Sequence, residues 1–156
     1  MHCGIRKNKT KRDLSLIVSQ KKAAAAAVYT TNLVKGAPIT VTKNNISDGY
    51  AQAIICNSGN ANTCNANGLE VAEQMSLITA KELNIAPQDV VVASTGVIGQ
   101  PLPLEPIAAG IPSLAAGLSP DGSNDAAEGI MTTDTKLKEI AAEFTIGGKT
   151  CHIGGI

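Results

Sequence analysis

Residues 51–56, which read AQAIIC, and residues 90–93, which read VVVA, are two short apolar runs of strand length. Between them, from Gly68 to Asn84, apolar side chains recur near helical spacing, and Asn84 is a residue type that ends helices. This order of strand, helix and strand predicts a fold of the α/β class, or a mixed α+β fold with strands in both directions.

The flanking segments continue this alternation. They are predicted as strands at residues 14–18 and 28–31, helices at residues 104–118 and 123–130, and a hairpin of residues 139–146 and 149–153. Pro112 is expected to kink or split the first helix, and Ser123 or Asn124 to cap the second. Residues 38–46 fit either a strand or a helix. No repeat or low-complexity linker interrupts residues 1–156, which are expected to form a single domain.

Composition excludes several classes of protein. Hydrophobic residues make up 44% of the chain, but it has no Trp, one Phe and two Tyr, so the core must be largely aliphatic. The 13 Lys and Arg balance the 13 Asp and Glu, which argues against a nucleic-acid or basic membrane-binding surface. No apolar run approaches the roughly 18 residues of a spanning helix, and no signal peptide precedes the first strand. We expect a cytoplasmic protein.

The four cysteines lack C-x-x-C spacing, which argues against a zinc ribbon or a thioredoxin-like motif. Cys151 and His152 are adjacent on a predicted strand and point to opposite faces, so they are poorly placed to share an ion. We expect no metal site, and free thiols that behave as small apolar residues.

Small polar residues follow both apolar strands. Residues 57–62, NSGNAN, could form an anion-binding nest of backbone N–H groups or a sharp turn held by Asn side chains. In the second segment, Gly96 allows close backbone approach, and the Thr95 hydroxyl and Gly96 N–H could donate to a developing oxyanion. A plain turn at the strand end explains residues 94–96 about as well.

A third polar segment, residues 131–135, reads MTTDT and could contact a polar substrate or cap the next element. No activated nucleophile accompanies these segments. The two imidazoles, His2 and His152, neighbour no Ser or Cys motif, and no carboxylate pair has a spacing typical of acid–base catalysis. This gap indicates that the chemistry is completed by groups outside these residues.

Six ordered motifs connect the chain to a known family. They are residues 2–5 (HCGI), 30–32 (TTN), 57–62 (NSGNAN), 93–99 (ASTGVIG), 130–135 (IMTTDT) and 153–156 (IGGI). On these motifs the sequence closely resembles, over essentially its whole length, the α chain of the ornithine acetyltransferases, the bifunctional glutamate N-acetyltransferases of arginine biosynthesis.

The resemblance implies an α/β sandwich shared with the β-peptidyl aminopeptidases, made as one precursor that cleaves itself at an Ala–Thr bond into α and β chains. The Thr that begins the β chain is the nucleophile, its α-amino group serves as the base, and the chains assemble as an α2β2 heterotetramer. Such an enzyme moves the acetyl group of N2-acetylornithine to glutamate through an acetyl-threonine. It needs no cofactor, and some members accept acetyl-CoA as donor.

Carried over residue by residue, Thr95 and Gly96 match the family's oxyanion hole, and Thr132 matches its substrate-contacting Thr, with Thr133 the weaker alternative. No particular contact is implied for residues 57–62. In the family, residues 153–156 are followed by a substrate-binding Lys and the cleavage site, and a short stretch usually precedes the His-Cys-Gly motif. Neither the Lys segment nor the cleavage site occurs among these 156 residues, so we expect the α portion of a precursor that is inactive alone.

Two other functions are weighed beside this one. The first is a subunit of a related N-terminal-nucleophile aminopeptidase, or hydrolase, in which water accepts the acyl group. The second is a non-catalytic α/β binding module that holds an anion on its Asn- and Gly-rich loop.

Overall fold

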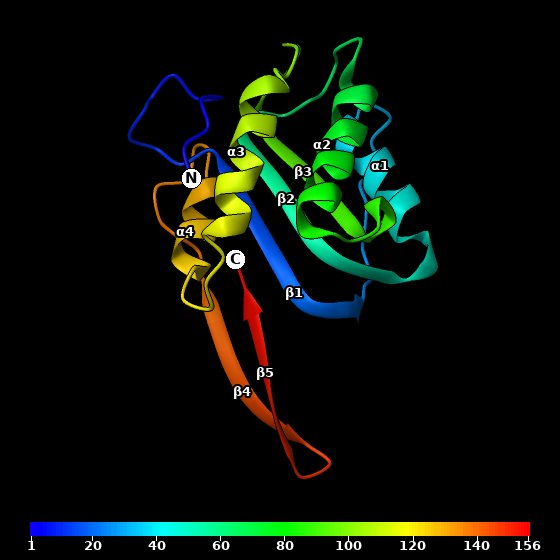
Figure 1. Cartoon of the computed structure of the whole chain (residues 1–156), viewed down its shortest axis with the longest axis vertical. Helices are drawn as coiled ribbons and strands as arrows, with labels where there is room; N and C mark the ends of the chain where they lie inside the picture. The colour runs from blue at the N-terminus through cyan, green and yellow to red at the C-terminus, as the bar shows by residue number, and fades with distance from the viewer.

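The computed structural model describes all residues from Met1 to Ile156, and its centre is a three-stranded sheet with the order β1-β2-β3 (Figure 1). The strands span Leu14–Ala24 (β1), Tyr50–Asn60 (β2) and Val90–Val97 (β3). β1 is antiparallel to β2, whereas β2 and β3 are parallel because α2, at Gly68–Leu83, carries the chain back between them. The predicted strand–helix–strand unit and the mixed strand directions are confirmed.

One face of the sheet is covered by helices and forms the core (Figure 1). The covering helices are α1 at Ala37–Asn45, α2, and α3 at Glu105–Ala116. Leu14, Ile55 and Val92 come from the three strands, face these helices and are at most 3% exposed. The hydroxyl of Thr42 in α1 donates to Val92 O at 2.8 Å and holds the helix against β3.

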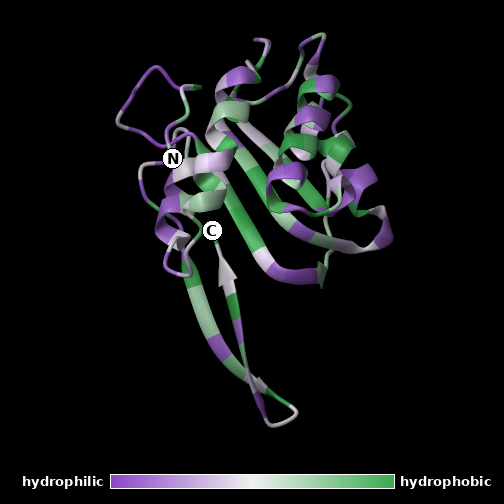
Figure 2. Ribbon diagram, in the orientation of Figure 1, coloured by the Kyte–Doolittle hydropathy of each residue, from purple (hydrophilic) through white to green (hydrophobic).

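The opposite face of the sheet is covered only at one end, by α4 at Ser123–Ile130. Ser15, which alternates with the core residue Leu14, donates its hydroxyl to Ala126 O at 2.9 Å. Further along this face the register partners Ile17 and Ile54 remain 40% and 38% exposed. We refer to this side of β1, β2 and β3 as the open face. In Figure 2 much of β1 and β2 carries the hydrophobic colour.

A separate hairpin, β4 at Ile140–Ile146 and β5 at Lys149–Gly155, extends away from the body of the protein (Figure 1). Gly147 and Gly148 form its turn with φ of 55° and 74°, as a type I′ turn requires. The hairpin was predicted from these glycines and is confirmed. Its apolar residues are exposed, Ile140 at 75% and Ile153 at 62%. A two-stranded hairpin is at best marginally stable alone, so we expect its apolar residues to pack against another protein surface.

Three local predictions need correction. Residues 28–31 form no strand, and Val28 is fully exposed, because β-branched residues favour a strand only where a neighbouring strand and a buried face receive them. α3 is not split at Pro112, which lies inside one continuous helix. α4 begins at Ser123 after Gly122 and has no side-chain cap. Residues 38–46, left open above, fall largely within α1, with Pro38 in its first turn.

None of the helices is both long enough and apolar enough to cross a lipid bilayer.

Candidate active site

The two segments predicted to be a loop or turn, at residues 57–62 and 94–96, lie side by side because the strands continue into them. In the parallel register Ser58 pairs with Thr95, and Gly59 pairs with Gly96. These pairs occupy the carboxyl ends of neighbouring parallel strands, where open α/β sheets commonly bind ligands. The predicted boundaries at residues 56 and 93 were therefore too early, since small polar residues here belong to strands.

Only glycine fits at residues 59 and 96, which pair with each other in the register of β2 and β3. Gly59 and Gly96 have φ of 105° and 134°, a region that other residues rarely adopt. A Cβ on Gly96 would lie 2.6 Å from Asn60 N and closer still to the carbonyl carbon of Gly59. The two backbones thus approach too closely for any side chain, and this fixes the orientation of the peptide between Thr95 and Gly96.

The Asn side chains of residues 57–62 are used within the chain. The Asn57 amide donates to Asn60 O at 2.9 Å, and Ser94 Oγ donates to Asn57 Oδ1 at 2.6 Å. Asn60 Oδ1 accepts the Asn62 N–H at 2.8 Å, and the Asn62 amide donates to Gly68 O at 2.8 Å. These bonds argue against an anion-binding nest, and residues 57–60 extend β2 instead of forming the alternative turn. The bonds also join the ends of β2 and β3 to the start of α2.

Thr95 points to the same side of the sheet as its register partner Ser58, which is the side that carries α4. There Ser58 Oγ donates to Gly129 O at 2.6 Å. The Thr95 side chain is half-buried and its hydroxyl forms no hydrogen bond with the rest of the chain, while Gly96 is exposed. The hydroxyl is therefore available to a group that approaches the open face.

The segment that carries Thr132 lies next to this pair. The bond from Ser58 to Gly129 anchors the end of α4 beside β2, three residues before Thr132. Thr132 is half-buried, and its N–H donates to Asp134 Oδ2 at 3.1 Å, whereas Thr133 is exposed. No helix follows within residues 131–139, so the capping interpretation of this segment is wrong. The structure thus brings together at one end of the sheet the three segments singled out in the sequence.

Sequence reasoning missed Asp13, which fixes the N-terminal segment against the same end of the sheet. Its carboxylate is fully buried and accepts N–H groups of Cys3 at 2.5 Å, Gly4 at 3.2 Å and Arg6 at 2.9 Å. Burial alone would raise the pKa of Asp13, but the N–H groups of Arg6 and Cys3, the Cys3 thiol and the nearby His2 outweigh it and lower the pKa below its ordinary value. An acidic residue directly before a buried strand was the available signal.

No side chain of this chain has the environment of an activated nucleophile. Burial raises the pKa of the Cys3 and Cys56 thiols to about 12, so both stay protonated at neutral pH. His2 Nδ1 lies 3.1 Å from the Asp13 carboxylate, and His152 is on the distant hairpin. No three His, Cys, Asp or Glu side chains gather closely enough to hold a metal ion.

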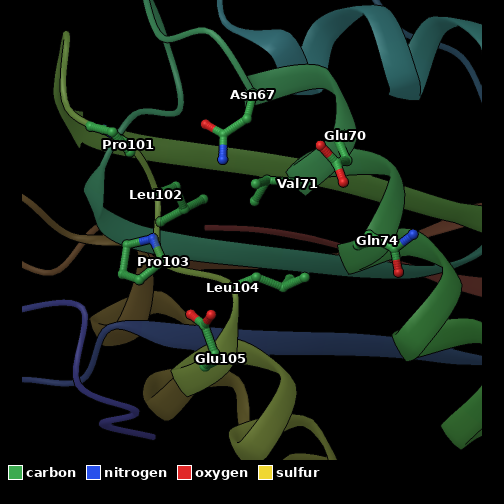
Figure 3. A pocket seen from close by; sticks show the side chains of 9 residues that line it. All are labelled: Asn67, Glu70, Val71, Gln74, Pro101, Leu102, Pro103, Leu104 and Glu105. Atoms are coloured by element: carbon green, nitrogen blue, oxygen red, sulfur yellow. The ribbon is translucent and has the colours of Figure 1, made fainter.

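A cavity of about 330 Å³ lies elsewhere, between α2 and the segment that leads into α3 (Figure 3). Its polar lining includes Glu70, Gln74 and Glu105. None of the residues discussed above lines it. It is therefore separate from the site formed by Thr95, Gly96 and the segment of Thr132.

The architecture defines a mixed helix-and-sheet fold of the ornithine acetyltransferase type. An ornithine acetyltransferase from Mycobacterium tuberculosis, solved in complex with ornithine, superposes with a TM-score of 0.90 at 31% identity over 98% of this chain and 82% of that chain. The arginine biosynthesis bifunctional protein ArgJ of Bacillus halodurans superposes with a TM-score of 0.92 at 39% identity, covering 99% of this chain and 81% of that chain. The predicted fold class is confirmed.

The family follows from the sequence comparisons. The model of the ArgJ family matches residues 1–156, and the chain belongs to this family. It is 50% identical over 147 residues to the arginine biosynthesis bifunctional protein ArgJ of Symbiobacterium thermophilum. That match covers 94% of this chain but 37% of the relative, so the chain spans little more than a third of that protein. The resemblance found in the six motifs is confirmed.

Proposed function

We propose that this chain is the α subunit of a cytoplasmic N-acetyltransferase that moves the acetyl group of N2-acetylornithine to glutamate through an acetyl-threonine. In this proposal it is the α portion of a precursor that cleaves itself. The nucleophile is the N-terminal Thr of the β chain, and Thr95 and Gly96 supply the oxyanion hole. The observation that carries it is the pairing of a free hydroxyl and an exposed Gly peptide at the end of β3, in a chain without a nucleophile of its own.

The reaction has two matching halves. The α-amino group of the β-chain Thr takes the hydroxyl proton while the oxygen attacks the acetyl carbonyl, and the negative charge collects on the carbonyl oxygen. The Thr95 hydroxyl and the Gly96 N–H donate to that oxygen. Collapse of the intermediate breaks the amide bond, the proton passes to the departing amine, and ornithine leaves an acetyl ester. The amine of glutamate then attacks the ester through the same oxyanion hole and restores the free Thr.

The rigidity of the β2–β3 junction suits this role. A preorganised donor contributes about 3–4 kcal/mol to transition-state stabilisation, because it needs no reorganisation as charge develops. Gly59 and Gly96 lie in direct backbone contact, and Asn57 holds Ser94, the residue before Thr95, by a hydrogen bond. Thr132, on the neighbouring segment, would contact the amino-acid part of the substrate, in preference to the exposed Thr133.

The open face and the hairpin fit the proposed assembly. Ile17, Ile54 and Ile153 are exposed apolar residues on two surfaces that this chain leaves uncovered. A β chain packed on the open face would bring its terminal Thr to Thr95 and would complete the sandwich, with two copies of each chain forming an α2β2 heterotetramer. No cofactor is needed for this reaction, and acetyl-CoA would enter only as an alternative acetyl donor.

The test uses the two-chain assembly, meaning this chain together with the chain that begins with the proposed Thr, purified from expression of the full precursor. The co-purifying chain should begin with Thr and should gain the mass of one acetyl group with N2-acetylornithine. Addition of glutamate should remove that acetyl group and yield N-acetylglutamate. Release of free acetate without dependence on glutamate would instead assign the chain to a hydrolase. A chain that purifies as a stable monomer with no acetylated partner would overturn the proposal in favour of a binding module.

A further inference from the structure

Arg6 is a cation without a partner at the edge of the proposed site. Its side chain is half-buried, and its Nε and Nη2 atoms are shielded from solvent with no hydrogen-bond acceptor in the chain. No carboxylate forms an ion pair with its guanidinium, since Asp13 receives only its backbone N–H. Two shielded guanidinium nitrogens without acceptors are unfavourable, so we expect an acceptor for them from outside this chain.

Arg6 lies next to two parts of the proposed site, the β2–β3 junction at Gly59 and the segment that carries Thr132. Its Cγ lies over Gly59, so closely that a Cβ on Gly59 would be 2.8 Å away, and Gly59 is the register partner of Gly96. Arg6 also lines a small cavity of about 90 Å³ together with Met131 and Asp134, the residues on either side of the Thr132–Thr133 pair. The cavity therefore lies beside the segment proposed to contact the substrate, and Arg6 connects it to Gly59, the register partner of Gly96.

The charges around this cavity favour an anion. Its two acidic lining residues each have a cationic partner: Glu128 pairs with Arg12, which Asp125 shares, and Asp134 pairs with Lys138. The remaining charges at the lining are the cations of Arg6 and Lys11. A space of this size admits a head group rather than a whole amino acid. Arginine binds planar carboxylates with paired N–H donors, a geometry that lysine does not offer.

We propose that Arg6 binds a carboxylate group of the amino-acid substrate, and so selects substrates that carry one beside the acetylated amine. This inference rests on the proposed function, because the ligand is the substrate of that same site. The long stem of Arg6 would hold the guanidinium at the mouth of the cavity while it packs on Gly59. Binding of the carboxylate there would place the neighbouring acetyl amide over the ends of β2 and β3.

The test compares ligands with and without the carboxylate in the two-chain assembly. Affinity for L-ornithine and for putrescine, its decarboxylated analogue, is measured by calorimetry, and kcat/KM is measured for N2-acetylornithine and N-acetylputrescine. Arg6→Met keeps the stem on Gly59 and removes the charge, and Arg6→Lys keeps the charge without the fork. Lys9→Met is the matched control, since it removes an exposed charge of the same N-terminal segment that does not line the cavity.

Loss of a hydrogen-bonded carboxylate partner should weaken ornithine binding roughly 10- to 100-fold in Arg6→Met. Putrescine binding and kcat/KM for N-acetylputrescine should be unchanged in Arg6→Met. Arg6→Lys should restore part of the loss, and Lys9→Met should behave as wild type. An equal loss for both acetyl donors would overturn the inference, because Arg6 would then pair with a carboxylate of the partner chain. An unchanged affinity for ornithine in Arg6→Met, or no ornithine binding in wild type, would overturn it as well. Arg6-dependent ornithine binding without acetyl transfer would refute the proposed function and leave the inference standing.

Discussion

Gly96→Ala is expected to damage the protein far more than the loss of one glycine suggests. An alanine at φ 134° costs about 1–3 kcal/mol in backbone strain. The new Cβ would also overlap the backbone of Gly59 and would lie 2.6 Å from Asn60 N, and moving two strands apart adds about 1–3 kcal/mol. The sum of about 2–6 kcal/mol is a large part of the stability of an ordinary domain.

The matched control is Gly99→Ala. Gly99 also has a positive φ, 78°, but a Cβ there would meet nothing within 4 Å. Only strain of about 1–2 kcal/mol applies at this position. The difference between the two variants therefore isolates the close approach of β2 and β3.

The assay is urea unfolding of the two-chain assembly, followed by circular dichroism. With a urea dependence of about 2 kcal/mol per M, Gly96→Ala should lower the midpoint by about 1–3 M and Gly99→Ala by about 0.5–1 M. Acetyl transfer by folded Gly96→Ala should also fall by about 100-fold, because a displacement near 1 Å is enough to misplace catalytic groups. Equal midpoints for the two variants would refute the close contact inferred between Gly59 and Gly96.

Two further predictions concern buried groups. The lowered pKa of Asp13 means that its carboxylate stabilises the fold above its ordinary pKa of 3.8 and loses this effect as the pH falls through the lower folded-state value. Asp13→Asn should therefore cost about 1–3 kcal/mol near pH 7 and flatten the acid loss of stability, whereas a variant as stable as wild type would contradict it. Cys3 and Cys56, whose thiols have a pKa raised by burial to about 12, should resist a thiol reagent near pH 8 until urea opens the fold. Rapid labelling of either thiol in native buffer would contradict the burial of the Cys3 and Cys56 side chains.

The sequence predicted those elements whose local signals agree with their surroundings. α2 shows helical periodicity and ends at Asn84, which adopts the left-handed conformation with φ 54°. The β4–β5 hairpin follows from two adjacent glycines. The strand predicted at residues 28–31 does not form, because β-propensity depends on a neighbouring strand and none pairs with these residues.

The site was found only in part for a related reason. Thr95 and Gly96 stood out because they follow an apolar strand, yet their contact with Ser58 and Gly59 depends on the parallel register, which no local signal specifies. In the sequence, nothing distinguishes Arg6 from the other cations of residues 6–12. Its guanidinium nitrogens lack an acceptor because of neighbours that are distant in the sequence, among them Gly59 and Asp134, and no local pattern predicts these neighbours.

In the proposed function, this chain stabilises the negative charge of a reaction whose nucleophile belongs to another chain. Thr95→Val removes the hydroxyl and keeps the shape of the side chain. We expect the partner chain of the variant to gain its acetyl group from N2-acetylornithine about 100- to 1000-fold more slowly than in wild type, as followed by intact mass in a single turnover. A variant whose partner is acetylated at the wild-type rate would show that the hydroxyl at the end of β3 takes no part in the chemistry.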